Sequence, residues 1–179
     1  TIKPFFEELL KSSELEPEKH DGAYELVQEI VKAYSKLESF TDIDYNDLNL
    51  IYLMTIISES KNRNKKLSLV DYSHLRDSDK LIIKNKINHV FDKSENREYI
   101  NRSGDRDTVG MFGTGFHTFR TKSNNESAQS FIKLCVDIYN LSDENIIFEK
   151  VKRVFDEGVN GLGSASASQI LHCLKPLTF

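Results

Sequence analysis

The residues whose types and spacing best suit the binding of a ligand are Gly161-Leu162-Gly163, in which two glycines flank one leucine. Glycines at these positions allow a tight turn that leaves backbone N–H groups facing outward. An apolar pattern with helical spacing precedes the turn over 146–155, and another follows it over 167–174. The first turn of the second helix adds unpaired N–H donors. These donors together suit an anionic oxygen, above all that of a phosphate.

The stretch resembles the helix-hairpin-helix motif of DNA-binding proteins, in which Gly-hydrophobic-Gly-x-x-Ser/Thr-Ala precedes an apolar helix. The residues that match the motif in register are Gly161, Leu162, Gly163, Ser166 and Ala167. The resemblance implies a helix-hairpin-helix-like element over 145–176 whose contacts to DNA come from Gly161, Gly163, Ser164, Ser166 and Lys175. The alternative interpretation is that Gly-Leu-Gly only joins two core helices.

A second stretch, from Gly110 to Arg120, combines glycines with aromatic residues. Glycines let the backbone come close to a ligand, aromatic faces stack on bases, and His and Arg supply donors. The candidate DNA contacts here are Met111, Phe112, Phe116, His117, Phe119 and Arg120. A reader of modified bases can extrude the base into such an aromatic-lined pocket. The alternative is a loop that Phe112 and Phe116 pin to the core.

The first part of this stretch, Gly110 to Phe116, and the segment Ser168 to Phe179 are similar to the N-terminal region of McrB-type restriction ATPases/GTPases of the AAA+ class. The resemblance covers the second half of the chain. It implies a bacterial, cytoplasmic restriction or phage-defence protein that recognises double-stranded DNA, methylated or otherwise modified. It also implies an NTP-dependent motor and an endonuclease partner, both reached through a missing C-terminal part. We expect the chain, which stops soon after Pro176, to be an N-terminal fragment.

Other chemistry has little support in the sequence. There is no Walker A sequence, so nucleotide hydrolysis by that route is not expected. His172 and Cys173 are adjacent, which is not a zinc-ligand spacing. Cys135 lies in an apolar helical pattern and is expected to be a packed thiol. We therefore predict no catalytic residue, no metal ligand and no cofactor in this chain.

Two other functional classes remain open. Base-excision glycosylases with a helix-hairpin-helix share the glycine pattern but carry a catalytic Asp further along. No Asp follows the hairpin in this sequence, and Ser164 to Gln169 holds no lysine. A helical adaptor that docks a partner protein is the other class, and it would show an exposed apolar patch with no basic stripe near the hairpin.

The charge of the chain is unevenly distributed. The formal net charge is −4, but residues 61–122 hold 14 Lys/Arg and 8 Asp/Glu between two acidic segments. A surface that contacts phosphate needs local positive charge rather than a basic protein. We therefore expect this block to supply the phosphate-facing surface, with Lys84 as a candidate contact. The alternative is that its lysines only keep a helix surface soluble.

The length of 179 residues fits a single domain, and 39% hydrophobic with 29% charged residues is typical of a globular protein. No apolar run approaches the roughly 18 residues that a membrane span needs, so no membrane partner is expected. Cys135 and Cys173 are expected to be buried thiols in a reducing compartment.

Apolar periodicity predicts a mainly α fold, a multi-helix single domain over 1–179 with one long Gly/Phe-rich loop or short hairpin. The expected helices span 23–37, 48–57, 79–92, 125–138, 146–155 and 167–174, with a short one near Pro4. The segment 48–57 is apolar almost all round, which fits a buried helix better than a strand. Ser142 or Asp143 is expected to cap the helix that enters the hairpin. Residues 59–66 are expected to be a frayed helix end and a polar loop, and 93–125 the main irregular segment.

Overall fold

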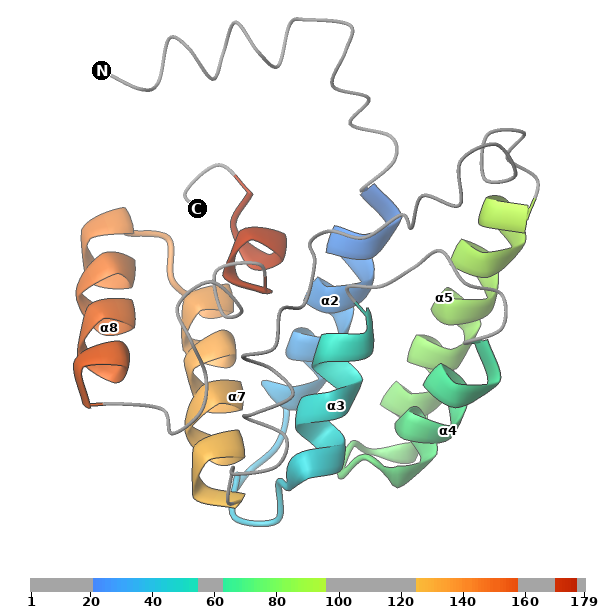
Figure 1. Cartoon of the computed structure of the whole chain (residues 1–179), viewed down its shortest axis with the longest axis horizontal. Helices are drawn as coiled ribbons and strands as arrows, with labels where there is room; N and C mark the ends of the chain where they lie inside the picture. Colours follow the sequence, from blue (N-terminus) through green and yellow to red (C-terminus); the bar gives the residue numbers. More distant parts are fainter. Residues whose placement is uncertain (1–20, 55–62, 96–124, 158–169, 177–179) are drawn as a thin grey trace, which may run out of the picture.

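The computed structural model describes residues 21–54, 63–95, 125–157 and 170–176. These ranges hold seven helices and no strand, so the mainly α prediction is confirmed for this part of the chain. Six helices carry labels in Figure 1, and a further helical segment covers residues 170–174. The labelled helices are α2 (Asp21–Tyr34), α3 (Tyr45–Met54), α4 (Arg63–Tyr72), α5 (Asp77–Glu95), α7 (Asn125–Asn140) and α8 (Glu144–Glu157). The helix expected near Pro4, the Gly110–Arg120 stretch and the Gly161–Ser166 stretch lie outside the described residues.

Helix α2 lies in the middle of the bundle and packs against α3, α5 and α7 (Figure 1). Its apolar residues recur every three or four positions, so they gather on one face and enter the core. The core residues of this helix are Leu26, Val27, Ile30, Val31, Ala33 and Tyr34. The stripe predicted for this segment is therefore confirmed, and α2 becomes the helix around which the others are arranged.

Helices α3 and α7 complete the same core. Leu48, Leu50 and Ile51 of α3 are fully buried, which confirms that this apolar segment is a central helix rather than a strand. Helix α7, which was predicted over 125–138, buries Ala128, Phe131, Leu134, Cys135 and Ile138. Side chains of these two helices meet those of α2, so one hydrophobic cluster runs through all three.

Helix α5 buries Ile83, Ile87 and Val90, as the sequence predicted, and extends over residues 93–95 that were expected to be irregular. Helix α4 differs from expectation, because residues 63–66 were expected to be a polar loop. The helix has no apolar stripe that periodicity could detect, and its buried positions are Lys66 and Val70. It packs against α3 and α5, so its place in the fold comes from tertiary contacts rather than from its own pattern.

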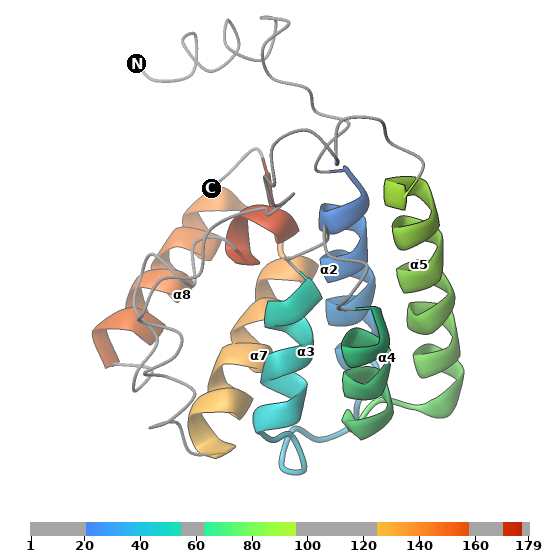
Figure 2. The ribbon, with the colours of Figure 1, turned by 45° about the vertical axis from the view of Figure 1, so that its right-hand side comes forward.

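Helix α8 lies at one edge of the bundle beside α7, opposite the edge formed by α5 (Figure 2). Of the two predicted caps, Asp143 is the one that is used. Its carboxylate Oδ1 accepts the N–H groups of Asn145 at 2.9 Å and Ile146 at 3.3 Å. Among the described residues, no helix is both long and apolar enough to cross a membrane.

Two neighbouring substitutions on α5 test this arrangement. Ile83 is fully buried and Leu81 is 62% exposed. Ile83→Ala should lower the free energy of unfolding by about 2–5 kcal/mol, because it leaves a cavity in the core. Leu81→Ala should change it by less than about 0.5 kcal/mol. Denaturant unfolding of both variants measures this, and equal losses would show that α5 is rotated relative to the core.

Candidate functional site

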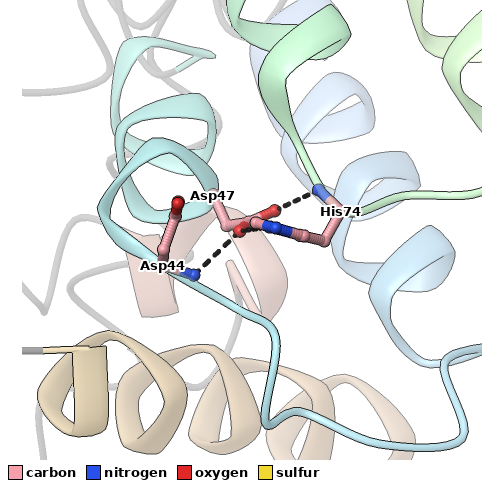
Figure 3. A group of neighbouring side chains, drawn as sticks. All are labelled: Asp44, Asp47 and His74. Atoms are coloured by element: carbon pink, nitrogen blue, oxygen red, sulfur yellow. Dashed lines mark hydrogen bonds and ion pairs between the residues drawn. The ribbon is translucent and has the colours of Figure 1, made fainter.

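The most connected polar group among the described residues is the carboxylate of Asp47, the third residue of α3, which has no exposed surface. Its Oδ1 accepts the hydroxyl of Tyr34 at 2.6 Å and the backbone N–H of His74 at 2.8 Å. Its Oδ2 accepts hydrogen bonds from Nδ1 of the His74 ring at 2.7 Å and from the backbone N–H of Asp44 at 3.0 Å. Figure 3 shows the backbone nitrogen of Asp44, and the backbone nitrogen and ring of His74, directed at this carboxylate.

The local sequence explains why α3 begins here. Asp44 precedes the helix, and its Oδ1 accepts the N–H of Asn46 at 2.6 Å. Asp47 reaches back to the N–H of Asp44 in return, so the two carboxylates satisfy donors that the first turn leaves unpaired. Both negative charges also lie at the positive end of the helix dipole. The start of α3 is therefore fixed by the spacing of these two aspartates.

The same carboxylate joins three elements of the bundle. Tyr34 ends α2, Asp47 lies in α3, and His74 belongs to the connection between α4 and α5. A buried charge is costly unless hydrogen-bonded partners surround it, so the three elements are held in the one arrangement that supplies them. Burial and the Asp47 charge raise the pKa of Tyr34 well above its ordinary value of 10.0, so its hydroxyl stays a donor.

Further polar contacts fix the connections around this carboxylate. Lys36, just after α2, pairs with Asp79 of α5, and the guanidinium of Arg76 donates to the carbonyl oxygen of Lys36 at 2.6 Å. Gln129 of α7 donates to the carbonyl oxygens of Thr41 at 2.9 Å and Ile43 at 3.2 Å. The segment between α2 and α3 is thereby attached to both α5 and α7.

Asp44, Asp47 and His74 offer ligand atoms that all lie within 4.8 Å of one another. Carboxylates and imidazole are common metal ligands. A buried Asp that is hydrogen-bonded to Nδ1 of a half-exposed His can also orient that His as a general base. Both oxygens of Asp47, however, already accept two hydrogen bonds each from the protein. A cation here would have to displace these donors, so the arrangement is best explained as a structural link between helices.

Two of the predicted DNA contacts fall within the described residues. Lys84 lies on α5, where its ammonium pairs with the carboxylate of Asp71, and binding a phosphate would require exchange of this partner. Lys175 is half-buried just after the helical segment 170–174. The other predicted contacts lie outside the described residues and stay predictions: Gly161, Gly163, Ser164, Ser166, Met111, Phe112, Phe116, His117, Phe119 and Arg120.

Part of the positive charge on α4 and α5 is paired with acidic neighbours. Besides the Lys84 pair, Arg63 pairs with Asp92 at 2.6 Å and Lys86 pairs with Glu25 at 3.2 Å. These pairs are at the surface, where each contributes about 0–1 kcal/mol and can exchange. The described part of the block is therefore less positive than its count of lysines and arginines indicates.

The helical segment 170–174 is attached to α2 by polar contacts. The hydroxyl of Tyr24 lies 3.0 Å from Nε2 of His172, and the two rings meet edge to face with centroids 5.4 Å apart. The side-chain amide of Gln28 donates to the carbonyl oxygen of Cys173 at 2.8 Å. Ile170 and Leu171 are buried in the shared core, so the end of the predicted hairpin element is fixed to the bundle.

The two cysteines are free and buried, as the sequence predicted. Burial raises the pKa of the Cys173 thiol to about 12, and it raises the pKa of Cys135 further. Since the thiolate is the reactive form, both thiols are inert near neutral pH. They act as small apolar core residues.

The Asp47 carboxylate and its partners were not identified from the sequence. The available signal for the reciprocal cap was the pair Asp44 and Asp47, spaced by three residues before an apolar run. No signal linked His74 to this cap, because the two lie 27 residues apart in the sequence.

Removal of the Asp47 charge should destabilise the bundle. Asp47→Asn replaces one accepting oxygen with an NH₂ group that faces donors, so buried hydrogen bonds are lost. We expect the free energy of unfolding to fall by about 2–4 kcal/mol. Asp42→Asn, at an exposed position of the same connection, is the matched control and should change it by less than about 0.5 kcal/mol. Equal stability of the two variants in denaturant unfolding would contradict the role assigned to Asp47.

The contribution of His74 should depend on pH. Its hydrogen bond to Asp47 and the charges of Asp47, Asp44 and Asp42 raise its pKa above the ordinary 6.5. Because the folded state binds this proton more tightly, the stabilisation is complete below pH 6.5 and declines as the pH rises through the raised value. His74→Ala should therefore lower the free energy of unfolding by about 1 kcal/mol near pH 6 and by less near pH 9. The loss is small because the imidazole is half exposed and its charge is screened by water. Urea unfolding of the original chain and of His74→Ala between about pH 6 and pH 9 measures this loss of stability. A loss that grows with pH would contradict the role assigned to the protonated His74.

Comparison with known proteins gives no match. No protein-family model, no curated protein and no solved structure matches this chain. The likeness to McrB-type proteins therefore stays an expectation from the motifs.

Proposed function

We propose that this chain is the DNA-binding specificity domain of a McrB-like bacterial restriction or phage-defence protein. One observation supports this more than any other: a helix lies on each side of the Gly161–Ser166 stretch. Helix α8 ends at Glu157, and residues 170–174 are helical. A helix before and a helix after Gly-Leu-Gly is the context that the helix-hairpin-helix motif requires. In that context the backbone donors of the turn and of the next helix are available to a phosphate.

The attachment of both flanking helices also supports the proposal. Helix α8 packs on α7, and Tyr24 and Gln28 of α2 hold the segment 170–174. A binding element mounted on packed helices keeps its donors in position, which lowers the cost of ordering it on binding. The bundle then acts as a scaffold for the Gly-Leu-Gly stretch.

In the mechanism that we propose, the two glycine-containing stretches make different contacts with DNA. The Gly161–Ser166 stretch holds a backbone phosphate, which positions the domain but carries no sequence information. The Gly110–Arg120 stretch contacts bases through its aromatic side chains, and a modified base is the ligand that such a pocket suits. The domain binds without catalysis, and an endonuclease partner joins through another part of the full protein.

A helical adaptor for a protein partner is the second candidate, and the surface of α4 and α5 favours it. Tyr72 and Leu81 are 67% and 62% exposed. The pairing of Lys84 and Lys86 with acidic residues also leaves less free positive charge on α5. Exposed apolar side chains together with paired charges fit a protein surface better than a phosphate backbone.

Variants in the two glycine-containing stretches should affect DNA binding differently. Gly163→Val fills the turn, so it should weaken binding to every duplex by about tenfold. Phe116→Ala should instead remove the preference for a methylated over an unmodified duplex, since a stacked base is worth about 1–3 kcal/mol. Each variant is titrated with both duplexes, and thermal melting checks that each is folded.

The salt dependence of binding separates DNA binding from the adaptor function. Binding driven by phosphate contacts should weaken steeply between about 50 and 200 mM salt, because counterions are released from the DNA. An unchanged affinity over this range, or no binding to any duplex by the folded chain, would contradict the proposal and favour the adaptor. A lower melting temperature for Phe116→Ala with its duplex preference intact would contradict base reading but leave the phosphate contact standing.

A further inference from the structure

The helical segment 170–174 lies beside the first turns of α2 (Figure 1 and Figure 2). Isolated helices shorter than about 12–15 residues are marginally stable in water, so contacts with the bundle must hold this segment. Its buried side chains are Ile170, Leu171, Cys173 and Leu174. Burial of apolar groups has no direction, so these contacts set the depth of the segment but leave its rotation and axial position undetermined. Directional contacts are needed to fix both.

Two directional contacts come from α2. Tyr24 and Gln28 are four residues apart, so they lie on one face of this helix. The side-chain amide of Gln28 donates to the carbonyl oxygen of Cys173 at 2.8 Å. The last carbonyls of a helix have no partner within it, so Gln28 caps the segment from a neighbouring helix. The hydroxyl of Tyr24 lies 3.0 Å from Nε2 of His172, and contacts on two consecutive residues fix both the rotation and the axial position.

Lys175, a predicted DNA contact, directly follows the segment that α2 holds. Its backbone N–H donates to the carbonyl oxygen of Leu171 at 3.0 Å, so its main chain continues the last helical turn and is fixed together with Cys173. Within the described residues, no hydrogen bond or ion pair holds its ammonium group. The ammonium of Lys84, by contrast, pairs with Asp71. Lys175 can therefore bind an anion without first giving up a partner.

We propose that Gln28 and Tyr24 are positioning residues, which hold Lys175 where its ammonium contacts a DNA phosphate. This inference rests on the proposed function, because it requires a DNA ligand. With both contacts present, the main chain at Lys175 is ordered before DNA arrives, so binding does not have to order it. Without them the segment takes up other orientations, and the apparent affinity falls in proportion to the fraction that stays competent. A phosphate contact carries no sequence information, so the loss is the same for every duplex.

Removal of the Gln28 amide from the whole chain tests the proposal. Gln28→Ala should weaken binding to a short, fluorescently labelled duplex by about three- to tenfold, because the hydrogen bond that fixes the segment is lost. Lys175→Ala should weaken binding and lower the salt dependence of the affinity by about one phosphate contact. Gln28→Ala should lower that salt dependence too, since the displaced ammonium no longer reaches the phosphate.

Two further variants separate positioning from general stability. Gln129→Ala is the matched control, because the Gln129 amide likewise donates to backbone carbonyl oxygens, those of Thr41 and Ile43, elsewhere in the bundle. It should leave the affinity and its salt dependence unchanged. Tyr24→Phe keeps the ring and removes only the hydroxyl, so it disturbs the fold least, and it should weaken binding by about two- to fivefold.

Fluorescence anisotropy at several salt concentrations gives the affinities, and thermal melting checks that each variant is folded. The double variant Gln28→Ala/Lys175→Ala should bind as Lys175→Ala alone does, since no phosphate contact is left to position. Original affinity for both Gln28→Ala and Tyr24→Phe, or an equal loss for Gln129→Ala, would overturn the positioning role while DNA binding stands. No binding by the original chain would instead contradict the proposed function, and the positioning role with it.

Discussion

The buried carboxylate of Asp47 is the interaction on which the arrangement of the bundle depends. It accepts four hydrogen bonds from three separate places: the end of α2, the start of α3 and the connection that leads into α5. Hydrophobic burial is nondirectional, so the apolar faces alone would allow these helices to slide or rotate relative to one another. A buried charge tolerates only the arrangement in which its donors are present, and thereby selects one packing.

The helices held together by this constraint are distinct from the stretches proposed to bind. Helices α2, α3, α5 and α7 share one core, and polar contacts fix the connections between them. The segment 170–174 is fixed to α2, so the end of the Gly-Leu-Gly element is held by the same core. Helix α8 precedes that element and packs on α7.

The sequence predicted the helices whose apolar residues recur at regular spacing. Helices α2, α5 and α7 each carry an apolar stripe, and Ile30, Ile83 and Phe131 are buried as that stripe requires. Helix α4 was not predicted, because its apolar residues form no stripe and its helical state depends on packing against α3 and α5. The Asp47 contacts were not predicted either, since the partners of a buried carboxylate are set by the fold and not by spacing in the chain. The glycine motif could be identified because it is local, whereas its ligand cannot be deduced from the bundle alone.

The most direct test of the account is to map where DNA contacts the chain. Titration of the ¹⁵N-labelled protein with a short duplex, followed by amide chemical shifts, locates the contact residue by residue. We expect the earliest and largest changes at residues 160–171 and 110–120, with the amides of α2 and α3 unchanged. Changes centred on the outer faces of α4 and α5, or none at saturating duplex, would contradict a DNA-binding element mounted on a rigid helical scaffold.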